Sequence, residues 1–195
     1  MTRRATWTVT GAAAIGLMML PVAVASPPVL VWNASASVPI GLYAVHPPGP
    51  LHIGQLVVAM PPEPLAAFLA RRDYLPERVP LLKHVAALPG QQICRAGVTV
   101  TIDDAFAGIA LTRDSRNRPL PAWDGCQTVA RGEVFLMNLN VPDSLDGRYF
   151  GTLPIASIRG IATPIWTRTR SQHPPRTTPA GAITPPPPPA ERTLP

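Results

Sequence analysis

The strand signal is clearest in the run Leu81-Leu82-Lys83-His84-Val85-Ala86-Ala87-Leu88-Pro89-Gly90. Its residues are mostly apolar and Pro89-Gly90 ends it as a turn, which is typical of a buried strand. Of the 17 lysines and arginines in the chain, only Lys83 is a lysine. Burial lowers the pKa of a lysine because it disfavours the charged form, and a neutral amine can act as a general base. The alternative is an edge-strand lysine whose amine reaches solvent.

His84 is the second candidate base in this run. Because neighbouring side chains of a strand face opposite ways, only one of Lys83 and His84 can point into a common site.

Further strand signals flank this run on both sides. They are short apolar or alternating stretches bounded by turn residues, at residues 56–60, 98–102 and 132–138. Residues 64–72 predict a short helix, with Leu65, Phe68 and Leu69 on one face. The sequence therefore predicts a mainly β domain.

The N-terminal region predicts a membrane anchor. Arg3 and Arg4 are followed by an uncharged run at residues 5–25, and a helix of that length, about 31 Å, would cross a hydrocarbon core of about 30 Å. Positive residues stay on the cytoplasmic side of a membrane. Residues 1–7 are therefore predicted to be cytoplasmic and residues 8–28 to be the transmembrane helix.

A cleaved secretory signal is the alternative to this anchor. Ala23-Val24-Ala25 before Ser26 is similar to a cleavage site, whereas the length of the apolar run and the further apolar residues at 29–32 favour the anchor. Residues 29–170 are then predicted to form the periplasmic domain. Residues 171–195 are rich in proline and poor in apolar residues, which predicts a disordered tail.

A long stretch without formal charge follows the predicted anchor. After Arg4 the next charged residue is Glu63, so residues 33–62 carry none. A solvated domain normally shows charges over such a length. Part of the stretch is expected to be buried β-structure, and the rest predicts a surface against membrane lipid, with Leu42 among its exposed apolar positions.

Composition argues against two other classes of site. The net charge is +6, but the basic residues are scattered without interleaved aromatics, so nucleic-acid binding is not expected. The histidines and cysteines lack the spacing of metal ligands. Cys94 and Cys126 instead predict a disulfide across a hairpin-like insertion, if the domain lies outside the cytoplasm. It would stabilise the domain by about 3 kcal/mol, and two reduced, buried thiols are the alternative.

Two further segments carry groups suited to catalysis. The first reads Asn33-Ala34-Ser35-Ala36-Ser37-Val38-Pro39-Ile40-Gly41-Leu42-Tyr43 and places two serines just beyond the predicted anchor. A serine hydroxyl becomes a strong nucleophile only when a base removes its proton. The second reads Asp143-Ser144-Leu145-Asp146-Gly147-Arg148-Tyr149-Phe150-Gly151. It predicts a polar loop that supports a site or, alternatively, a turn held by an Asp–Arg pair.

Taken in their order along the chain, the serine segment, the lysine segment and the segment 143–151 resemble the motifs of the type I signal peptidase family, and most closely its conjugative-transfer, TraF-type branch. The branch has a nucleophile motif of approximately Asn-x-[Ser/Thr]-x-Ser-x-Pro-x-Gly-Leu-Tyr, a Lys-Arg-Val-x-[Gly/Ala]-x-Pro-Gly motif and a Ser-x-Asp-x-Arg-Tyr-[Trp/Phe]-Gly motif. The chain departs from the family in having His84 after the lysine instead of arginine. It also has Val38 where leader peptidases have methionine, which favours the conjugation branch.

The resemblance implies roles for individual residues. Ser37 would be the nucleophile and Lys83 the base. The oxyanion hole would be the backbone N–H of Ser37 and the hydroxyl of Ser35. Ser144 would orient the Lys83 amine. Two further residues, Asp146 and Arg148, would pair and brace the loop.

The resemblance also implies a fold, a location and a reaction. We expect an antiparallel β fold with a shallow groove beside the membrane, on the periplasmic side of a bacterial inner membrane, and no metal or cofactor. The reaction would be endopeptidase cleavage of a signal-peptide-like segment, in particular in a pilin precursor of conjugation or type IV secretion. The alternatives are a general leader peptidase and a non-enzymatic, membrane-anchored assembly protein whose proline-rich tail binds a partner.

Overall fold

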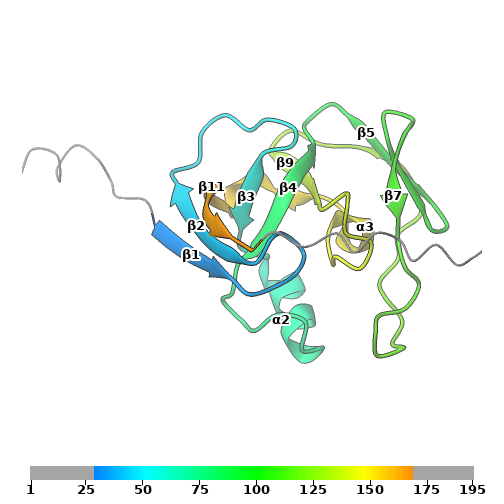
Figure 1. The fold of residues 1–195 in the computed structure, drawn as a ribbon. Coiled ribbons are helices and arrows are strands. Elements are labelled where there is room, and N and C mark those ends of the chain that lie inside the picture. The colour runs from blue at the N-terminus through cyan, green and yellow to red at the C-terminus, as the bar shows by residue number, and fades with distance from the viewer. Residues whose placement is uncertain (1–28, 169–195) are drawn as a thin grey trace, which may run out of the picture.

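The computed structural model describes residues 29–168, which form two β-sheets with short helices (Figure 1). The predicted cytoplasmic segment 1–7, the predicted anchor 8–28 and the predicted tail 171–195 lie outside the described residues. Within residues 29–168, no helix is both long enough and apolar enough to span a bilayer.

A seven-stranded sheet forms the larger part of the domain. Its strands are β1 (Val29–Asn33), β2 (Gly41–His46), β3 (Leu56–Ala59), β4 (Leu81–Ala87), β9 (Glu133–Met137), β10 (Leu153–Pro154) and β11 (Ile158–Thr167). They lie in the order β1-β2-β11-β3-β4-β9-β10, and every neighbouring pair is antiparallel. The mainly antiparallel β prediction is confirmed.

A smaller sheet occupies the place of the predicted hairpin-like insertion. Its four strands are β5 (Gln92–Ala96), β6 (Thr99–Ile102), β7 (Ala105–Ile109) and β8 (Gly125–Thr128), in the order β7-β6-β5-β8. A single hairpin was therefore too simple a prediction. In Figure 1 this small sheet lies on the side of the molecule away from β1.

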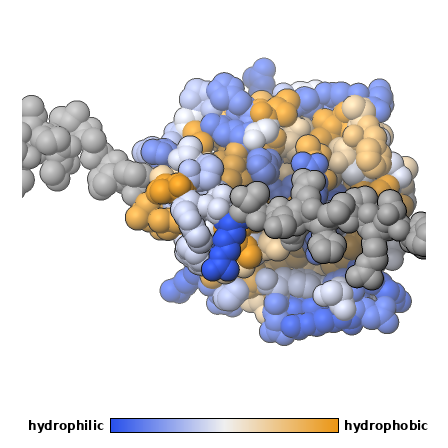
Figure 2. All heavy atoms as spheres, in the orientation of Figure 1, coloured by the Kyte–Doolittle hydropathy of each residue, from blue (hydrophilic) through white to orange (hydrophobic). Residues whose placement is uncertain are grey.

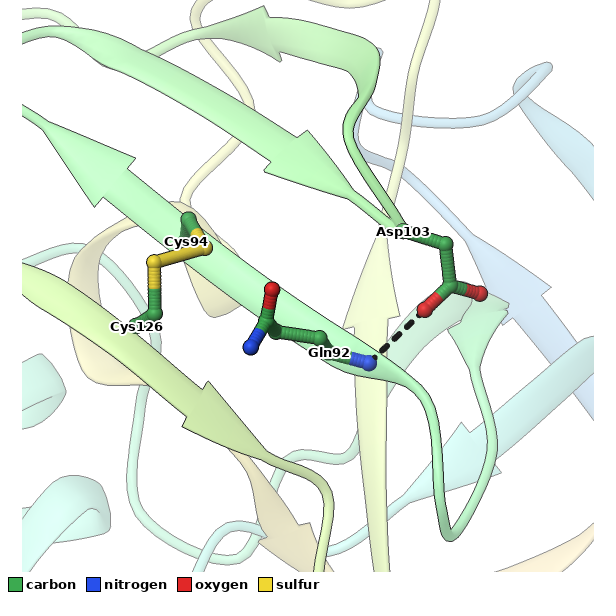
Figure 3. The surroundings of a disulfide bond; sticks show 4 residues. All are labelled: Gln92, Cys94, Asp103 and Cys126. Carbon is green, nitrogen blue, oxygen red and sulfur yellow. Dashed lines mark hydrogen bonds between the residues drawn. A yellow bond between two sulfur atoms is a disulfide. The ribbon is translucent and has the colours of Figure 1, made fainter.

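A disulfide joins β5 and β8, which are neighbours in the small sheet. Cys94 and Cys126 are directly paired across β5 and β8 and are bonded to one another (Figure 3). Nearby, the backbone N–H of Gln92 donates to the Asp103 carboxylate over 2.8 Å and holds the turn after β6 against β5. The two cysteines are 32 positions apart in the sequence. Closing a loop of that size removes unfolded-state entropy worth about 3–4 kcal/mol.

Two α-helices and one short 3-10 helix, η1 (Ile155–Ser157), complete the domain. The predicted helix at 64–72 is α2 (Glu63–Arg71), with Leu69 buried. The second, α3 (Gly147–Phe150), lies in the segment predicted as a loop. It forms because the Asp146 carboxylate accepts the backbone N–H of Arg148 and so caps the first turn.

A cluster of buried side chains joins the small sheet to β4 and β9 of the larger sheet. Ile93 and Val100 of the small sheet pack in one buried cluster with Phe135 and Met137 of β9 and Tyr149 of α3. Burying side chains of this size stabilises a domain by about 1.5–3 kcal/mol each. Ala86 and Ala87 of β4, the strand that carries Lys83, belong to the same cluster.

Two motif glycines are required by close approaches. A Cβ at Gly41 would lie 2.1 Å from the carbonyl oxygen of Trp166, so only glycine lets β2 approach β11 there. A Cβ at Gly147 would lie 2.5 Å from the ring of Phe135, so α3 can pack directly on β9. Both contacts set the position of a segment that carries predicted site residues.

Candidate active site

The segment with the two serines is a tight loop between β1 and β2, folded around the side chain of Asn33. Its amide nitrogen donates to the carbonyl oxygens of Ser35 (2.8 Å), Val38 (3.1 Å) and Pro39 (3.2 Å). Its oxygen accepts the backbone N–H of Ser35 over 3.1 Å. The hydroxyl of Tyr43 also donates to Pro39, over 2.6 Å. Asn33 is thus the organising residue of the loop, a role that the sequence pattern did not reveal.

The two serine hydroxyls form a directed chain. Ser35 Oγ lies 3.0 Å from Asn33 Oδ1 and 3.0 Å from Ser37 Oγ. The three carbonyl partners of the Asn33 amide nitrogen fix which side-chain atom is the oxygen. Because that oxygen has no proton, Ser35 must donate to it, and its single proton is then used. Ser37 is therefore the donor in the serine pair, with its proton directed at Ser35.

Lys83 lies in the middle of β4 and is only 3% exposed. Its Nζ donates to Ser144 Oγ over 2.7 Å. Burial lowers the pKa of the Lys83 amine to about 8; Asp146 and Asp143 oppose this shift and Arg148 adds to it. An amine with that pKa is neutral in about a tenth of the molecules at pH 7, whereas an ordinary lysine is almost wholly charged.

Asp146 and Arg148 form a buried pair beneath the lysine. Both are at most 1% exposed, and two hydrogen bonds of 2.9 Å join the guanidinium to the carboxylate. The guanidinium also donates to the carbonyl oxygens of Val141 (2.7 Å) and Ser144 (3.2 Å). Removing one partner of such a pair typically costs about 3–5 kcal/mol. The pair therefore fixes the backbone of Ser144. The negative charge of Asp146 raises the pKa of Lys83, and the positive charge of Arg148 opposes that rise.

Asn138, just beyond β9, is a further buried contact that the sequence gave no clear reason to single out. Its amide nitrogen donates to Leu82 O (3.3 Å) and Ser144 Oγ (3.5 Å), and its backbone N–H donates to Asp146 (3.0 Å). Its side-chain oxygen accepts the backbone N–H of His84 (3.3 Å) and lies 2.9 Å from His84 Nδ1, which must therefore carry a proton. A polar residue at the end of a buried strand was the only signal in the sequence.

Two cavities meet at Ser37. The first, here called the lysine cavity, has a volume of about 590 Å³ and is lined by Ser35, Ser37, Lys83 and Ser144. The second, here called the main groove, has a volume of about 740 Å³ and is lined by Ser37 and His84. Lys83 and His84 thus border different cavities, as alternation along a strand predicts.

The predicted site residues are brought together by this arrangement. In the described part of the chain no hydrogen bond joins Ser37 to Lys83, whose amine is instead paired with Ser144. Ser37 and Lys83 line the same cavity, and Asp146 and Arg148 are both buried. Cys94 and Cys126 lie apart from the site, in the small sheet.

The main groove is predominantly apolar. Its apolar lining residues include Ala36, Val38, Ile40, Val85, Ala86 and Met137. Its lining contains no acidic residue, and its ionisable side chains are His84 and Arg168. Such a groove suits an extended peptide with small or apolar side chains.

The oxyanion assignment of Ser35 yields a prediction. Ser35→Ala should lower kcat by about 10² to 10³ and leave KM nearly unchanged, because one donor to the developing charge is lost. Ser35→Thr should recover much of the rate because it restores the hydroxyl. Steady-state kinetics on one precursor peptide measure both effects. Full activity of Ser35→Ala would remove Ser35 from the oxyanion hole.

Comparison with known proteins places the chain in a family. Residues 3–167 match the model of the family described as signal peptidase, peptidase S26. The chain is 36% identical over 146 residues to a probable conjugal transfer protein TraF of Sinorhizobium fredii, covering 69% of this chain and 76% of that protein. It is 32% identical over 146 residues to a conjugal transfer protein TraF of Agrobacterium fabrum, covering 69% and 81%.

A solved structure was also found, a signal peptidase I from Enterococcus faecalis, with a TM-score of 0.36 and 21% identity over 60% of this chain and all of that chain. The assignment rests on the family model and the TraF proteins. The non-enzymatic alternative is wrong, because the family is one of serine peptidases. The chain belongs to the signal peptidase family, peptidase S26.

Proposed function

We propose that this peptidase uses Ser37 and Lys83 as a catalytic dyad, is anchored in the inner membrane with its active site on the periplasmic side, and matures a pilin-like precursor for conjugative transfer. The observation that carries the dyad is the buried Lys83 amine, which is held by Ser144 in the cavity that Ser37 also lines. Burial supplies the neutral amine that general-base catalysis requires.

The first step is attack by Ser37 on the scissile carbonyl. The Ser37 proton is directed at Ser35 in the free enzyme, so it must turn toward Lys83 before transfer. A bound carbonyl oxygen favours this rearrangement, since Ser35 can leave Asn33 and donate to the oxygen instead. As the Ser35 hydroxyl turns away from Asn33, its contact with Ser37 is lost, and Ser37 passes its proton to Lys83 as the bond between Ser37 Oγ and the carbonyl carbon forms.

Lys83 next passes that proton to the leaving group. The Lys83 ammonium protonates the departing amine as the peptide bond breaks, which leaves an acyl group on Ser37. Neutral Lys83 then takes a proton from water as the water oxygen attacks the acyl carbon, and the Lys83 ammonium gives that proton to Ser37 Oγ as the ester bond breaks and the acid is released. Ser144 keeps the amine oriented through both steps.

The relatives and the main groove support the choice of substrate. The two TraF relatives are named for conjugal transfer. Family membership implies a precursor protein as substrate, and the apolar groove beside Ser37 suits the small residues at the end of a signal-like segment. A general leader peptidase would share this groove, so substrate range separates the two.

Co-expression tests the proposed substrate class. The full chain is expressed with a pilin precursor encoded beside its gene, and separately with an unrelated secreted precursor. Mass spectrometry should show processing of the pilin precursor only. Processing of both at similar rates would establish the general leader peptidase, and processing of neither would refute the proposed function.

The rate should rise with pH through the pKa of Lys83. Because the neutral amine is the active form, log(kcat/KM) should rise with a slope near one below pH 8 and level off above it. Assays of a soluble peptide between pH 6 and 10 measure this limb. A rate that is flat from pH 6 to 8 would contradict a lysine base with this pKa.

An apolar face near β1 supports the membrane location. Trp32 and Trp166 are both paired in register with Leu42, so the three side chains share one face of the sheet. The two indole rings stack at 5.9 Å and are more than half exposed. Figure 2 shows hydrophobic atoms gathered at the start of β1. Tryptophan is enriched at membrane interfaces, and the predicted anchor immediately precedes this strand.

A charge on this face should slow cleavage of membrane-embedded substrates more than cleavage of soluble ones. Leu42, predicted as exposed, is half-buried, so Trp32 is the better position. Trp32→Asp should reduce cleavage of a membrane-embedded precursor several-fold more than cleavage of a short soluble peptide. Phe106→Asp, an exposed change in the small sheet, is the control and should alter neither rate. Equal losses on both substrates would indicate damage to the fold instead.

A further inference from the structure

The small sheet holds α3, the helix that follows Ser144. Arg95 on β5 is only 3% exposed. Its guanidinium donates to the backbone carbonyl of Arg148 over 2.6 Å, to that of Gly97 over 2.9 Å and to that of Pro121 over 3.4 Å. Arg95 thus joins the turn after β5, the segment before β8 and α3.

Two other contacts hold neighbouring residues of the same helix. Trp123 Nε1–H donates to the carbonyl oxygen of Gly147 over 3.1 Å. The hydroxyl of Tyr149 accepts the backbone N–H of Leu111 over 2.9 Å. Three consecutive residues of α3 are therefore fixed by the segment between β5 and β8, which the Cys94–Cys126 disulfide closes.

Arg95 differs from the other buried arginine in its partners. Arg148 has a carboxylate partner, whereas no ion pair involves Arg95 anywhere in residues 29–168. A buried cation that relies on backbone carbonyls alone carries a desolvation penalty that an apolar side chain would avoid. A buried arginine at this position is explained if its hydrogen bond to Arg148 has a use beyond packing.

The path from Arg95 to the reacting groups is short. Arg95 holds the backbone of Arg148, whose own guanidinium holds the carbonyl of Ser144 at 3.2 Å. Ser144 Oγ in turn accepts the Lys83 amine at 2.7 Å. Each of these three contacts is a buried hydrogen bond, so a displacement of the Arg95 side chain should shift Ser144 relative to Lys83.

We propose that Arg95 and Trp123 are positioning residues for catalysis: they hold α3 from the small sheet and so keep Ser144 within hydrogen-bonding reach of Lys83. This inference rests on the proposed role of Lys83 as the base. It gives the small sheet a part in the reaction, although none of its residues lines the lysine cavity or the main groove.

The single lysine of the chain permits a direct test. Full-length protein in detergent micelles, labelled with [¹³Cε]lysine, gives one signal whose pH titration reports the pKa of Lys83. The midpoint should be displaced from the wild-type value in Arg95→Met, which removes the guanidinium, and in Trp123→Phe, which removes the indole N–H and keeps a smaller aromatic ring. It should be unchanged in the control Arg113→Met, whose exposed guanidinium binds only the Asn117 carbonyl.

Kinetics on a soluble peptide provide the second readout. Arg95→Met and Trp123→Phe should lower kcat by roughly ten- to a hundredfold, the effect of misplacing a catalytic group by a fraction of an ångström to 1 Å, with KM within about twofold. Arg95→Lys should recover part of the loss because it retains a cation and at least one carbonyl contact. In a Ser144→Ala background, Arg95→Met should change kcat by less than about twofold, since it acts through Ser144.

The proposal is overturned if folded Arg95→Met and Trp123→Phe titrate with the wild-type midpoint, or if Arg95→Met lowers kcat equally with and without Ser144. Should Arg95→Met fail to fold, Trp123→Phe decides, because it keeps an aromatic side chain and leaves Arg95 in place. Failure of the proposed function is distinguishable: wild-type protein would then cleave no precursor, while the titration would still report whether the small sheet positions Ser144.

Discussion

Lys83→Arg should abolish peptide cleavage although it preserves the positive charge. Lys83 is buried, and its amine has a pKa of about 8 because burial disfavours the charged form. A guanidinium stays protonated at any pH a protein tolerates, so it cannot accept the Ser37 proton. We expect no turnover above background between pH 7 and 9, measured by mass spectrometry on a precursor peptide.

The control for this change is the reverse exchange at an exposed position. Arg131→Lys leaves the site untouched and should retain full activity. Thermal unfolding of Lys83→Arg should verify that the variant is folded, because a larger cation in a buried position is itself destabilising. Appreciable turnover by folded Lys83→Arg would exclude Lys83 as the base.

Ser37→Ala should produce the second large effect. It removes the proposed nucleophile, and losing the nucleophile of a serine peptidase lowers kcat by roughly 10⁴-fold or more. The loop should remain intact, since its hydrogen bonds run through Asn33 and not through the Ser37 side chain. Quenched time courses on one peptide should show neither product nor an acyl-enzyme.

The comparison with Ser35→Ala separates the two serines. Loss of an oxyanion donor leaves a measurable rate, whereas loss of the nucleophile does not. If Ser37→Ala were more active than Ser35→Ala, the two roles would have to be exchanged.

The sequence predicted those features that depend on local pattern. Alternation along residues 81–90 placed Lys83 and His84 on opposite sides of a strand, and they border different cavities. The family resemblance predicted that Asp146 and Arg148 pair, and the structure joins them by two hydrogen bonds. Helix α2 begins within one residue of its predicted start, because its apolar face and its first-turn proline are local signals.

Features that depend on distant partners could not be predicted in this way. Strands β1 and β2 lie in an apolar, uncharged region whose composition indicated membrane contact as readily as a sheet. The small sheet was predicted as a hairpin because alternation identifies strands but not their neighbours. Helix α3 is only four residues long, too short for a periodic signal.

The supporting residues were hidden for a similar reason. Asn33, Asn138 and Arg95 act through hydrogen bonds to backbone groups, and a backbone group has no signature in the sequence. Only the folded chain brings Arg95 to α3, 53 positions away. Motifs therefore point to the candidate reacting groups, whereas the geometry of the fold shows which residues hold them in place.

The central claim is that a neutral lysine serves as the base, and the [¹³Cε]lysine titration of the wild-type protein tests it most directly. The chain has one lysine, so one resonance reports one residue and no substrate is needed. The account predicts a midpoint near 8, because burial in the lysine cavity disfavours the ammonium form. A midpoint near 10.4, the ordinary value for a solvated lysine, would show that Lys83 stays charged at neutral pH and would contradict the account.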